Sequence, residues 1–483
     1  MTASTRSEPF AAYIDGSWRS GATEVDVIDP STETHVATVA FADHETANEA
    51  VRSANAAQPA WEATPAPSRG DVLRCMRTVL LKHRDHLADI LVAEGGKPLA
   101  EARGEVQFAA DYVQYMAEWD RRIEGQIFPS DTAMERIEAH RVALGVVAAI
   151  CPWNYPIAVM FRKVAPALLT GNTVIVKPSE VTPLSSVAAM RLLADELDLP
   201  PGVLNLVSGG KDVGSALVSN PDVDMISMTG HRDSGKAIMA AAAQSMTRVS
   251  LELGGKAPAI VCADADLDAT VEALVFARYQ HAGQVCTCVE RVLVDARVHD
   301  EFVERLLAAT RLLRVGHPMG EVDMGPLVSG LQRDKVSRAV DRAVADGATV
   351  RLGGARPDGA EFERGYWYAP TVLTEVEPDM SIMTEEVFGP VLPIWRYADL
   401  NEAISVANAS RYGLSAFVFT SDYRTAMQTV DRLRCGEIYV NRTHGEAMQG
   451  FHVGHGESGI GGEDGIHGVL EYTQLKSVYH YYG

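Results

Sequence analysis

The spacing of apolar residues divides the chain into a helical first part and two later stretches in which strands and helices alternate. Between residues 43 and 95, apolar side chains recur at every third or fourth position until Gly95 and Gly96, and this spacing predicts helices. The periodicity is lost between Ile127 and Arg141, where polar and apolar residues alternate in ERIEAHRV. That alternation predicts a short pair of strands.

The two later stretches have the pattern of strand–helix repeats. Strands are expected in VALGVVAAI, NTVIVK, VLNLV and DMISM, with helices between them at residues 157–169, 184–197 and 212–219. The same pattern returns after Lys256, with strands at 257–264 and 291–295 and helices at 267–281 and 299–314. It predicts parallel sheets with helices on both faces, so the expected fold class is α/β with two doubly wound, Rossmann-like units. A ligand is then expected near the carboxyl ends of the strands.

The C-terminal segment, TQLKSVYHYYG, has no strand partner in the sequence around it. Terminal strands of this kind often complete the sheet of another subunit. We therefore expect this tail to pair with a second copy of the chain.

Composition and charge exclude several classes of function. A chain of 483 residues with 47% hydrophobic and 22% charged residues is long enough for two or three globular domains. Its 43 Lys and Arg against 64 Asp and Glu give a net charge of −21, which repels phosphate backbones and anionic lipid headgroups. Nucleic acid and membrane surfaces are therefore not expected as partners.

The chain carries no sign of export or of a metal site. Met1 to Trp18 contains no apolar run that could serve a secretion signal, and the apolar stretch from Val142 to Trp153 is too short to span a bilayer. The six cysteines lack the paired spacing of a zinc site, and their scarcity is typical of the reduced cytoplasm. We expect a cytoplasmic protein without a bound metal.

Three short motifs carry candidate chemistry. In GQVCTC, Cys286 follows a Gly-Gln turn between a helix and a strand, where a thiolate could act as a nucleophile. In LELGGK, Glu252 ends a strand and could serve as a general base for water. In PWNYP, the amide of Asn154 could donate to a developing oxyanion. Taken singly, each has a structural alternative: a buried thiol, a solvated carboxylate and a turn residue.

Two glycine-containing loops are candidates for binding phosphate. SGGKDVG, from Ser208 to Gly214, and MTGHRDSG, from Met228 to Gly235, each join a strand to a helix. The N-terminus of a helix attracts the negative charge of a nucleotide phosphate. Neither loop matches G-x-G-x-x-G, so the glycine pattern alone is a weak signal.

Taken together and in this order, the motifs resemble those of the aldehyde dehydrogenase superfamily. The resemblance runs from YIDGSW near the N-terminus to EYTQLKSV near the C-terminus, and it includes PWNYP, TGNTVIVKPSE, PDVDMISMTG, LELGGKAP, GQVC, EEVFGP and YGLSA. The interval of 34 residues from Glu252 to Cys286 also matches the family's spacing between base and nucleophile.

The resemblance implies an organisation for the whole chain. It assigns residues 1–126 and 142–255 to an NAD-binding domain and residues 256–455 to a catalytic domain. Residues 127–141 and 470–483 correspond to the family's oligomerisation elements. The implied assembly is a homo-oligomer, either a tetramer built from dimers or a dimer.

The resemblance also implies roles for individual residues. Cys286 would attack the carbonyl of a small-molecule aldehyde, Asn154 would hold the oxyanion together with the Cys286 backbone N–H, and Glu252 would activate the water that hydrolyses the thioester. Lys163 would relay a proton, with a packed helix-surface lysine as the alternative. Cofactor contacts are implied at Trp153, Lys177, Ser179, Glu180, Gly210, Gly214, Thr229, Gly230, His231, Glu386 and Phe388.

The residue at position 180 favours NAD as the cofactor. The Glu180 carboxylate can accept hydrogen bonds from ribose hydroxyls but would repel the additional phosphate of NADP. His231 departs from the family pattern, which usually has a small Ser after Thr-Gly. Its bulk changes the pose expected for the pyrophosphate.

Two substitutions point to a polar substrate. Arg162 and His452 stand where family members that take apolar aldehydes have aromatic side chains, so a polar, partly cationic tunnel mouth is expected. Buried donors left unpaired against an alkyl chain cost about 1 to 3 kcal/mol each. The segment EAMQGFH, from Glu446 to His452, is most similar to family members that act on lactaldehyde or glycolaldehyde. Small α-hydroxyaldehydes are therefore expected, with Arg162, Glu446 and His452 as contacts.

Several alternatives remain at this stage. Arg162 could instead bind the carboxylate of succinate semialdehyde, although the second arginine that the family often has six residues before the nucleophile is replaced by Gln280. The specificity could also be broad. Arg162 and His452 could also form only salt bridges across the rim. A CoA-acylating dehydrogenase would need no hydrolytic base, and a thiol hydrolase would pair Cys286 with His281. A noncatalytic protein on the same fold would lack the nucleophile or the base.

Cys288 lies two residues beyond the candidate nucleophile and is a candidate oxidative partner for it. Such a short ring would be strained, so a small structural residue is the alternative.

Overall fold

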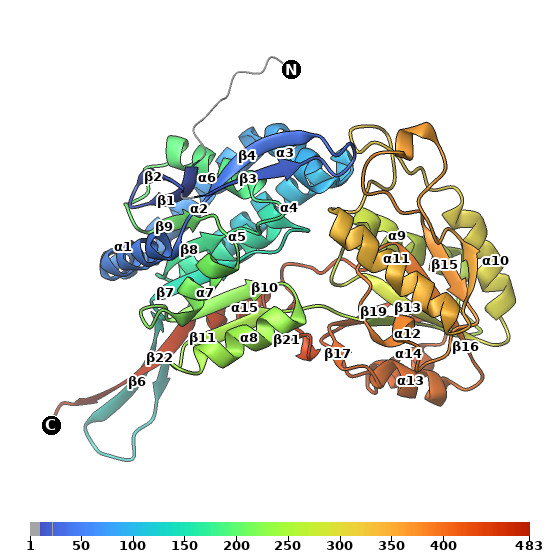
Figure 1. The fold of residues 1–483 in the computed structure, drawn as a ribbon. Coiled ribbons are helices and arrows are strands. Elements are labelled where there is room, and N and C mark those ends of the chain that lie inside the picture. The colour runs from blue at the N-terminus through green and yellow to red at the C-terminus, as the bar shows by residue number, and fades with distance from the viewer. Residues whose placement is uncertain (1–9, 22) are drawn as a thin grey trace.

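The computed structural model describes residues 10–21 and 23–483, which form two α/β units and smaller sheets (Figure 1). Residues 1–9, which belong to the segment expected to carry no secretion signal, lie outside the described residues. Among the described helices, none is both long and apolar enough to pass through a bilayer.

The first unit is built on an eight-stranded sheet in the order β2-β1-β9-β8-β7-β10-β11-β21. Its five central strands are parallel, and β1 and β21 pair with them in the antiparallel sense. The parallel strands stand in the order third, second, first, fourth and fifth along the chain, which is a doubly wound sheet with its switch point between β7 and β10. The strands are β1 Phe10–Ile14, β2 Ser17–Ser20, β7 Val146–Ile150, β8 Thr173–Lys177, β9 Leu204–Val207, β10 Met225–Thr229, β11 Arg248–Glu252 and β21 Gly459–Ile460.

Helices cover both faces of this sheet. Neighbouring side chains of β7 point to opposite faces, so that Val147 packs into one hydrophobic cluster and Val146 into another. Helices α2 to α6 supply most of the first cluster, and α1, α7 and α8 supply the second. The helices are α1 His44–Ala63, α2 Ala66–Lys82, α3 Arg84–Gly95, α4 Leu99–Ala117, α5 Pro156–Leu169, α6 Leu184–Glu196, α7 Lys211–Ser219 and α8 Arg232–Ala242.

The second unit holds a seven-stranded sheet in the order β14-β15-β16-β13-β12-β18-β19, parallel except for β14. Its strands are β12 Ala257–Val261, β13 Val289–Asp295, β14 Thr349–Leu352, β15 Thr371–Thr374, β16 Val391–Tyr397, β18 Ser415–Phe419 and β19 Glu437–Val440. Its helical segments are α9 Leu267–Tyr279, η1 Gln280–Gly283, α10 His299–Thr310, α11 Gly330–Ala345, η2 Ala360–Phe362, α12 Ser381–Thr384, α13 Leu400–Asn408 and α14 Tyr423–Val430. Two α/β units with parallel sheets confirm the expected fold class.

The strand predicted at residues 142–150 is interrupted in the structure. Gly145 adopts a φ of 139°, and the Leu144 and Gly145 N–H groups both donate to Asn172 Oδ1 rather than to a neighbouring strand. The residues before this turn extend β6 and those after it form β7. The prediction was wrong here because a continuous apolar run does not reveal a turn whose hydrogen bonds are completed by a distant side chain.

The expectation that the C-terminal tail lacks a strand partner within its own chain was wrong. Strand β22 Thr473–Tyr481 pairs antiparallel with β6 Glu135–Ala143 of its own chain, and β5 Gln126–Phe128 completes a three-stranded sheet. All nine residues of β22 take part, from Thr473 opposite Ala143 to Tyr481 opposite Glu135. This sheet projects from the first unit (Figure 1). The tail therefore has a partner, which is far away in sequence.

The remaining elements are short. Strands β3 Thr23–Ile28 and β4 His35–Phe41 form a hairpin, β17 Tyr412–Gly413 pairs with β20 His455–Gly456, and α15 Gly465–Glu471 leads into β22.

Candidate active site

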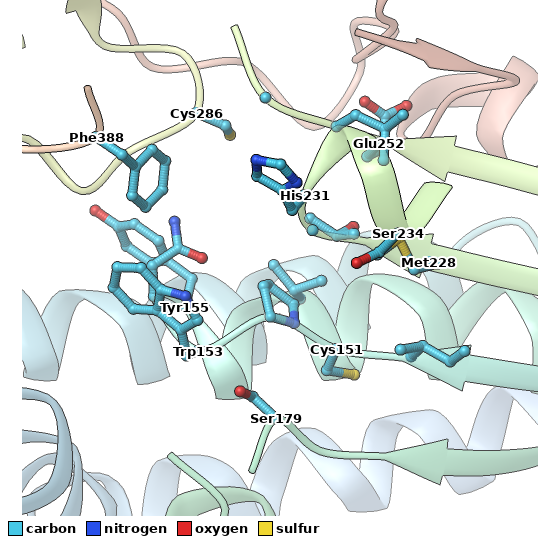
Figure 2. A pocket seen from close by; sticks show the side chains of 18 of the residues that line it. Cys151, Trp153, Tyr155, Ser179, Met228, His231, Ser234, Glu252, Cys286 and Phe388 are labelled. Carbon is cyan, nitrogen blue, oxygen red and sulfur yellow. The ribbon is translucent and has the colours of Figure 1, made fainter. Parts of the chain in front are cut away.

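A cavity of about 980 Å³ lies at the carboxyl ends of the parallel strands of the first unit and is closed on its other side by loops of the second (Figure 2). Cys151, Lys177, Thr229 and Glu252, which lie at or just after the ends of β7, β8, β10 and β11, all line it. This is where the doubly wound sheet was expected to bind a ligand.

Cys286 reaches this cavity from the loop between η1 and β13. The loop can follow this path because Gly283, at φ 72°, has no side chain; a Cβ there would lie 2.4 Å from Arg278 Nη2 and 2.5 Å from Gly389 O. Helix α9 ends two residues earlier than predicted, since His281 and Ala282 adopt left-handed conformations at φ 47° and 53°. Burial raises the pKa of the Cys286 thiol above its ordinary value.

Glu252 is buried at the end of β11, and neither of its carboxylate oxygens has a hydrogen-bond partner among the described residues. Its nearest cation is the His452 imidazole, whose Nε2 lies 3.6 Å from Glu252 Oε2. Burial raises the pKa of this carboxyl to about 8. A buried carboxylate without hydrogen bonds has the properties of a general base that meets water only when water enters the cavity.

Asn154 lies in the turn that follows β7 and is buried. Its side-chain amide donates to Gln284 O at 2.9 Å, and its own carbonyl accepts from Lys97 Nζ at 2.9 Å. An amide nitrogen carries two hydrogens, so one remains for a ligand. Asn154 and Cys286 both line the cavity, as the role of an oxyanion donor requires.

The residues expected to bind a dinucleotide line the other part of the cavity. Lys177 lies 3.5 Å from Glu180 Oε2, and Glu180 is 53% exposed. The cavity wall in this part is made by Trp153, Lys177, Ser179, Glu180, Gly210, Gly214, Thr229, Gly230 and His231. Two helices, α7 and α8, begin here.

The structure offers direct signs that a phosphate-bearing group fits this wall. A Cβ on Gly210 would meet nothing within 4 Å, so the chain is open to the cavity there. Thr229 Oγ1 is buried without a hydrogen-bond partner among the described residues. His231 caps α8, its Nδ1 accepting from Asp233 N at 3.2 Å, so its bulk turns toward the helix end. Backbone N–H groups at helix starts and an unpaired hydroxyl suit a pyrophosphate.

Glu386 and Phe388 approach from the second unit. Glu386 Oε1 accepts from Gly255 N at 2.8 Å, and burial raises the pKa of this carboxyl to about 7. Phe388 adopts φ 56° and contacts Trp153 edge to face, with ring centroids 5.3 Å apart. Both residues line the cavity, and Figure 2 shows Phe388 above Trp153.

Arg162 lines the cavity but does not offer a free charge. It forms a bidentate pair with Asp464 and further ion pairs with Glu446 at 3.1 Å and Glu463 at 3.5 Å. The expected cationic tunnel mouth is therefore absent from the part of the chain that the structure describes. Glu446 lines the cavity beside it, and although burial works against its charge, Arg162 lowers its pKa to about 2.

Two other residues lie elsewhere than expected. His452 is buried rather than at a tunnel mouth, and its Nδ1 lies 3.0 Å from Glu437 Oε1. Lys163 is fully buried and donates to Glu463 Oε1 at 2.5 Å and to Ser227 Oγ at 3.2 Å. It is not among the residues that line the cavity. Lys163 was expected to relay a proton and His452 to contact the substrate, because motif positions do not reveal which buried carboxylate will pair with each cation.

The geometry also bears on Cys288 and His281. Cys288 is buried and its thiol donates to Gly283 O at 3.6 Å, in keeping with a structural residue. His281 stands edge-on to Tyr155, 5.8 Å away, and no described hydrogen bond joins it to Cys286. The pairing that a thiol hydrolase would use is thus not formed.

Sequence reasoning missed the partners that hold the site. Glu437, which binds His452, and His444, which accepts or donates a 2.8 Å hydrogen bond with Gln280, come from the end of the second unit. His444 stacks on Phe276, and both line the cavity. The available signal was the acidic residue at the start of the apolar run EIYV, but a solvent-facing strand end would show the same pattern.

Comparisons with known proteins agree with this geometry. Residues 18–478 match the profile of the Aldehyde dehydrogenase family. The chain is 47% identical to "Lactaldehyde dehydrogenase" of Escherichia coli (strain K12), over 97% of this chain and 98% of that protein. The crystal structure of lactaldehyde dehydrogenase from Escherichia coli superposes with a TM-score of 0.95, covering 98% of this chain and 99% of that one.

Two further structures carry cofactors. One is 3,6-anhydro-L-galactose dehydrogenase in complex with NAP, with a TM-score of 0.96 at 41% identity over 98% of this chain and 99% of that one. The other is betaine aldehyde dehydrogenase from Staphylococcus aureus in complex with NAD+, with a TM-score of 0.95 at 34% identity over 98% and 95% of the two chains.

Proposed function

Because the chain belongs to the aldehyde dehydrogenase family, we propose that it oxidises a small hydroxylated aldehyde to its carboxylic acid with NAD as cofactor. The observation that carries the proposal is the position of Cys286, Glu252 and Asn154 on one cavity, with both Glu252 oxygens unpaired. That cavity continues into a wall suited to a dinucleotide.

The first half of the reaction uses the thiol and the amide. The Cys286 thiol gives up its proton to water in the cavity, Sγ bonds to the aldehyde carbon, and the carbonyl oxygen becomes the oxyanion of a thiohemiacetal. The free N–H of the Asn154 amide and the Cys286 backbone N–H hold that oxygen. NAD, when bound, supplies the acceptor for the hydride that leaves this carbon. Cys286 then carries a thioester.

The second half of the reaction uses Glu252. Its carboxylate takes a proton from water, and the water oxygen attacks the thioester carbon. The carbon–sulfur bond breaks, the acid leaves and the thiol is restored. A CoA-acylating enzyme would need no such base, so the buried, unpaired Glu252 favours hydrolysis.

The choice of NAD over NADP rests on Glu180. Its exposed carboxylate faces the part of the cavity assigned to the adenosine ribose, and Lys177, the neighbouring cation, is already paired with it. The two related structures with cofactors carry NAP in one case and NAD+ in the other. Family membership alone therefore does not decide between them, whereas a carboxylate at this position disfavours an added phosphate.

The preference for a hydroxylated substrate rests on Glu446. It is a buried carboxylate that lines the cavity, and it can accept a hydrogen bond from a substrate hydroxyl. One of its oxygens is already paired with Arg162, and an alkyl chain could not donate a hydrogen bond to the other. The relatives whose names specify lactaldehyde and 3,6-anhydro-galactose act on hydroxylated aldehydes, which supports the same class.

Succinate semialdehyde is the second candidate and is less well supported. Its carboxylate would need a free cation, but Arg162 is paired with three carboxylates. The Glu446 carboxylate at the same wall would repel it.

The assembly that we propose is a homodimer or a homotetramer. The projecting sheet of β5, β6 and β22 carries exposed apolar side chains, with Ile127 at 74% and Leu475 at 55% exposure. Tyr479 and Tyr481 on β22 are exposed as well. A projecting apolar surface of this kind is typical of an interface between copies.

The proposal is tested by measuring NADH formation without CoA. Lactaldehyde and glycolaldehyde should give higher kcat/KM than hexanal and succinate semialdehyde, and Cys286→Ala should remove NADH formation with all four. Hexanal as the preferred substrate would overturn the polar-substrate part. No NADH with any aldehyde would overturn the whole proposal.

A further inference from the structure

A buried lysine holds the backbone of Asn154, which lies outside any helix or strand. Residues 151–155 form the irregular segment that separates β7 from α5. Lys97 Nζ donates to the Asn154 carbonyl oxygen at 2.9 Å. Lys97 is 2% exposed and lies two residues before α4 begins. Because a cation in the interior is destabilising unless it is paired, its partners show what it is placed to hold.

The Lys97 ammonium is enclosed by three groups. It donates to the Glu105 carboxylate, on α4, and to the Asn154 carbonyl. The nitrogen also lies 3.6 Å from the centroid of the Tyr155 ring, which is the geometry of a cation–π contact. An ammonium has three donors and no acceptor, so these contacts leave it little freedom to turn. Lys97 therefore ties the backbone of Asn154 to α4.

Glu105 also holds the start of α5. Its Oε1 accepts from the N–H of Ile157 at 2.9 Å and from the N–H of Ala158 at 3.1 Å. The first residue of α5 is a proline, which has no N–H, and the residue before it makes no capping hydrogen bond with its side chain. Glu105 thus satisfies, from another helix, the donors that an N-cap side chain normally satisfies. The segment that carries Asn154 is fixed at its α5 end as well as at its carbonyl.

The same helix holds the loop of the nucleophile. Glu101, one turn earlier on α4, accepts from His281 N at 3.1 Å. Gln284 connects this loop to Asn154, because its carbonyl accepts from the Asn154 amide at 2.9 Å and its own side-chain amide donates to His281 O at 3.0 Å. The nucleophile lies two residues beyond Gln284. Two carboxylates four positions apart on α4 therefore hold the loop of the oxyanion donor and the loop of the thiol.

We propose that Lys97, held by Glu105, is a positioning residue for the oxyanion-binding amide of Asn154. Lys97 is not among the residues that line the cavity, and it acts through the peptide carbonyl that it binds. That carbonyl is held by Lys97 while one amide hydrogen is held by Gln284 O, so the other amide hydrogen keeps a fixed direction. A donor fixed in advance stabilises the developing oxyanion without turning during the reaction.

The inference rests on the proposed function in taking Cys286 as the nucleophile and Asn154 as the oxyanion donor. Two reactions of Cys286 that need neither aldehyde nor NAD test it. With p-nitrophenyl acetate, Sγ bonds to the acetyl carbon, the thiol proton passes to water, an oxyanion forms and p-nitrophenolate leaves. With iodoacetamide, Sγ displaces iodide from a methylene carbon and no oxyanion forms. Both rates are measured on the full-length protein by acid quenching and mass spectrometry of the Cys286 peptide.

The ratio of the acetylation rate to the alkylation rate reports on the oxyanion donor. Asn154→Ala should lower this ratio about hundredfold, because one donor is lost. Lys97→Met should lower it about tenfold or more, because the donor remains but is displaced. Adding Lys97→Met to Asn154→Ala should lower the ratio no further, since the lysine acts only through that amide.

A matched control is available at the other end of α5. The buried Arg69 is also a cation that binds a backbone carbonyl, its Nε donating to Leu169 O at 2.8 Å. Arg69→Met should therefore lower stability in a comparable way. The ratio should stay at the wild-type value in this variant, because α5 is loosened far from Asn154.

Each outcome decides for or against the inference. An unchanged ratio in Lys97→Met overturns it, as does an equal fall in Arg69→Met or a further tenfold fall when Lys97→Met is added to Asn154→Ala. A wild-type ratio in Asn154→Ala overturns it too, since the amide would then hold no oxyanion. If Lys97→Met does not fold, Glu105→Gln decides, because it weakens the hold on Lys97 and should lower the ratio in the same direction, and a wild-type ratio there overturns the inference. The expected ratios in a protein that forms no NADH with any aldehyde would refute the proposed function and leave the role of Lys97 standing.

Discussion

The ionisation of Glu252 should control the rate at which the acyl-enzyme is hydrolysed. Burial raises the pKa of this carboxyl to about 8, and among its neighbours His452, Lys163 and Arg162 favour the charged form while Glu463 opposes it. Only the carboxylate form can take a proton from water. Since the pKa is raised, the base is mostly protonated at neutral pH and appears as pH rises.

The magnitude follows from that value. With a pKa of about 8, about 1% of Glu252 is ionised at pH 6, about 10% at pH 7 and about 90% at pH 9. Deacylation should therefore accelerate about tenfold per pH unit below pH 8 and level off above it. The ordinary carboxyl pKa would instead give a flat profile over this range.

The assay isolates the hydrolytic step. Cys286 is acetylated with p-nitrophenyl acetate, the mixture is quenched at intervals after a jump to each pH, and loss of the acetyl adduct is measured by intact mass. Glu252→Gln provides the baseline, since its side chain matches in size and cannot accept the proton. A wild-type profile that is flat from pH 6 to 8, or one that Glu252→Gln reproduces, would refute the reasoning.

Three further outcomes are expected. The kcat/KM measured with NAD should exceed that with NADP by about tenfold or more, which is equivalent to about 1.4 kcal/mol. Glu180→Gln should narrow this ratio. Equal activity of the wild type with both cofactors would contradict the role of Glu180. Arg162→Leu should lower the free energy of unfolding, measured with urea, by about 3 to 5 kcal/mol, because it leaves buried carboxylates without their cation. Arg305→Leu, at an exposed ion pair, should change the free energy of unfolding little. Equal effects of the two variants would argue against a stabilising role for the buried ion pairs of Arg162. Sedimentation at micromolar concentration should show an oligomer that Tyr479→Asp weakens, and a monomeric wild type would count against the projecting sheet as an interface.

The sequence predicted the fold class and most regular elements because periodicity reports which face of a helix or strand is buried. The helices before Gly95 and the parallel strands are confirmed, and Cys286, Glu252 and Asn154 do line one cavity. The break at Gly145 was missed because the hydrogen bonds that complete it come from Asn172, a residue outside the local pattern.

Charge partners were the least predictable feature. The sequence shows that Arg162 and His452 are polar, but not that Asp464 and Glu437 fold back to neutralise them. Arg162 and Asp464 are 302 positions apart in the sequence, and His452 and Glu437 are 15 positions apart. Local spacing carries no information about such pairs, so the expected cationic tunnel mouth was wrong while the polarity of the residues was right.

The strand β21 has a consequence for how the protein is made. Gly459 and Ile460 pair with Glu252 and Leu251, so the edge of the first sheet is supplied by residues translated after the entire second sheet. The first unit therefore cannot be completed while the ribosome is still synthesising the second. Until residues 459 and 460 have been translated, β11 remains an unpaired edge of the first sheet. Termination between residues 260 and 458 should release a polypeptide whose first sheet lacks β21. For the same reason, a gene fragment ending near residue 255 would be a poor choice for producing the first unit by itself.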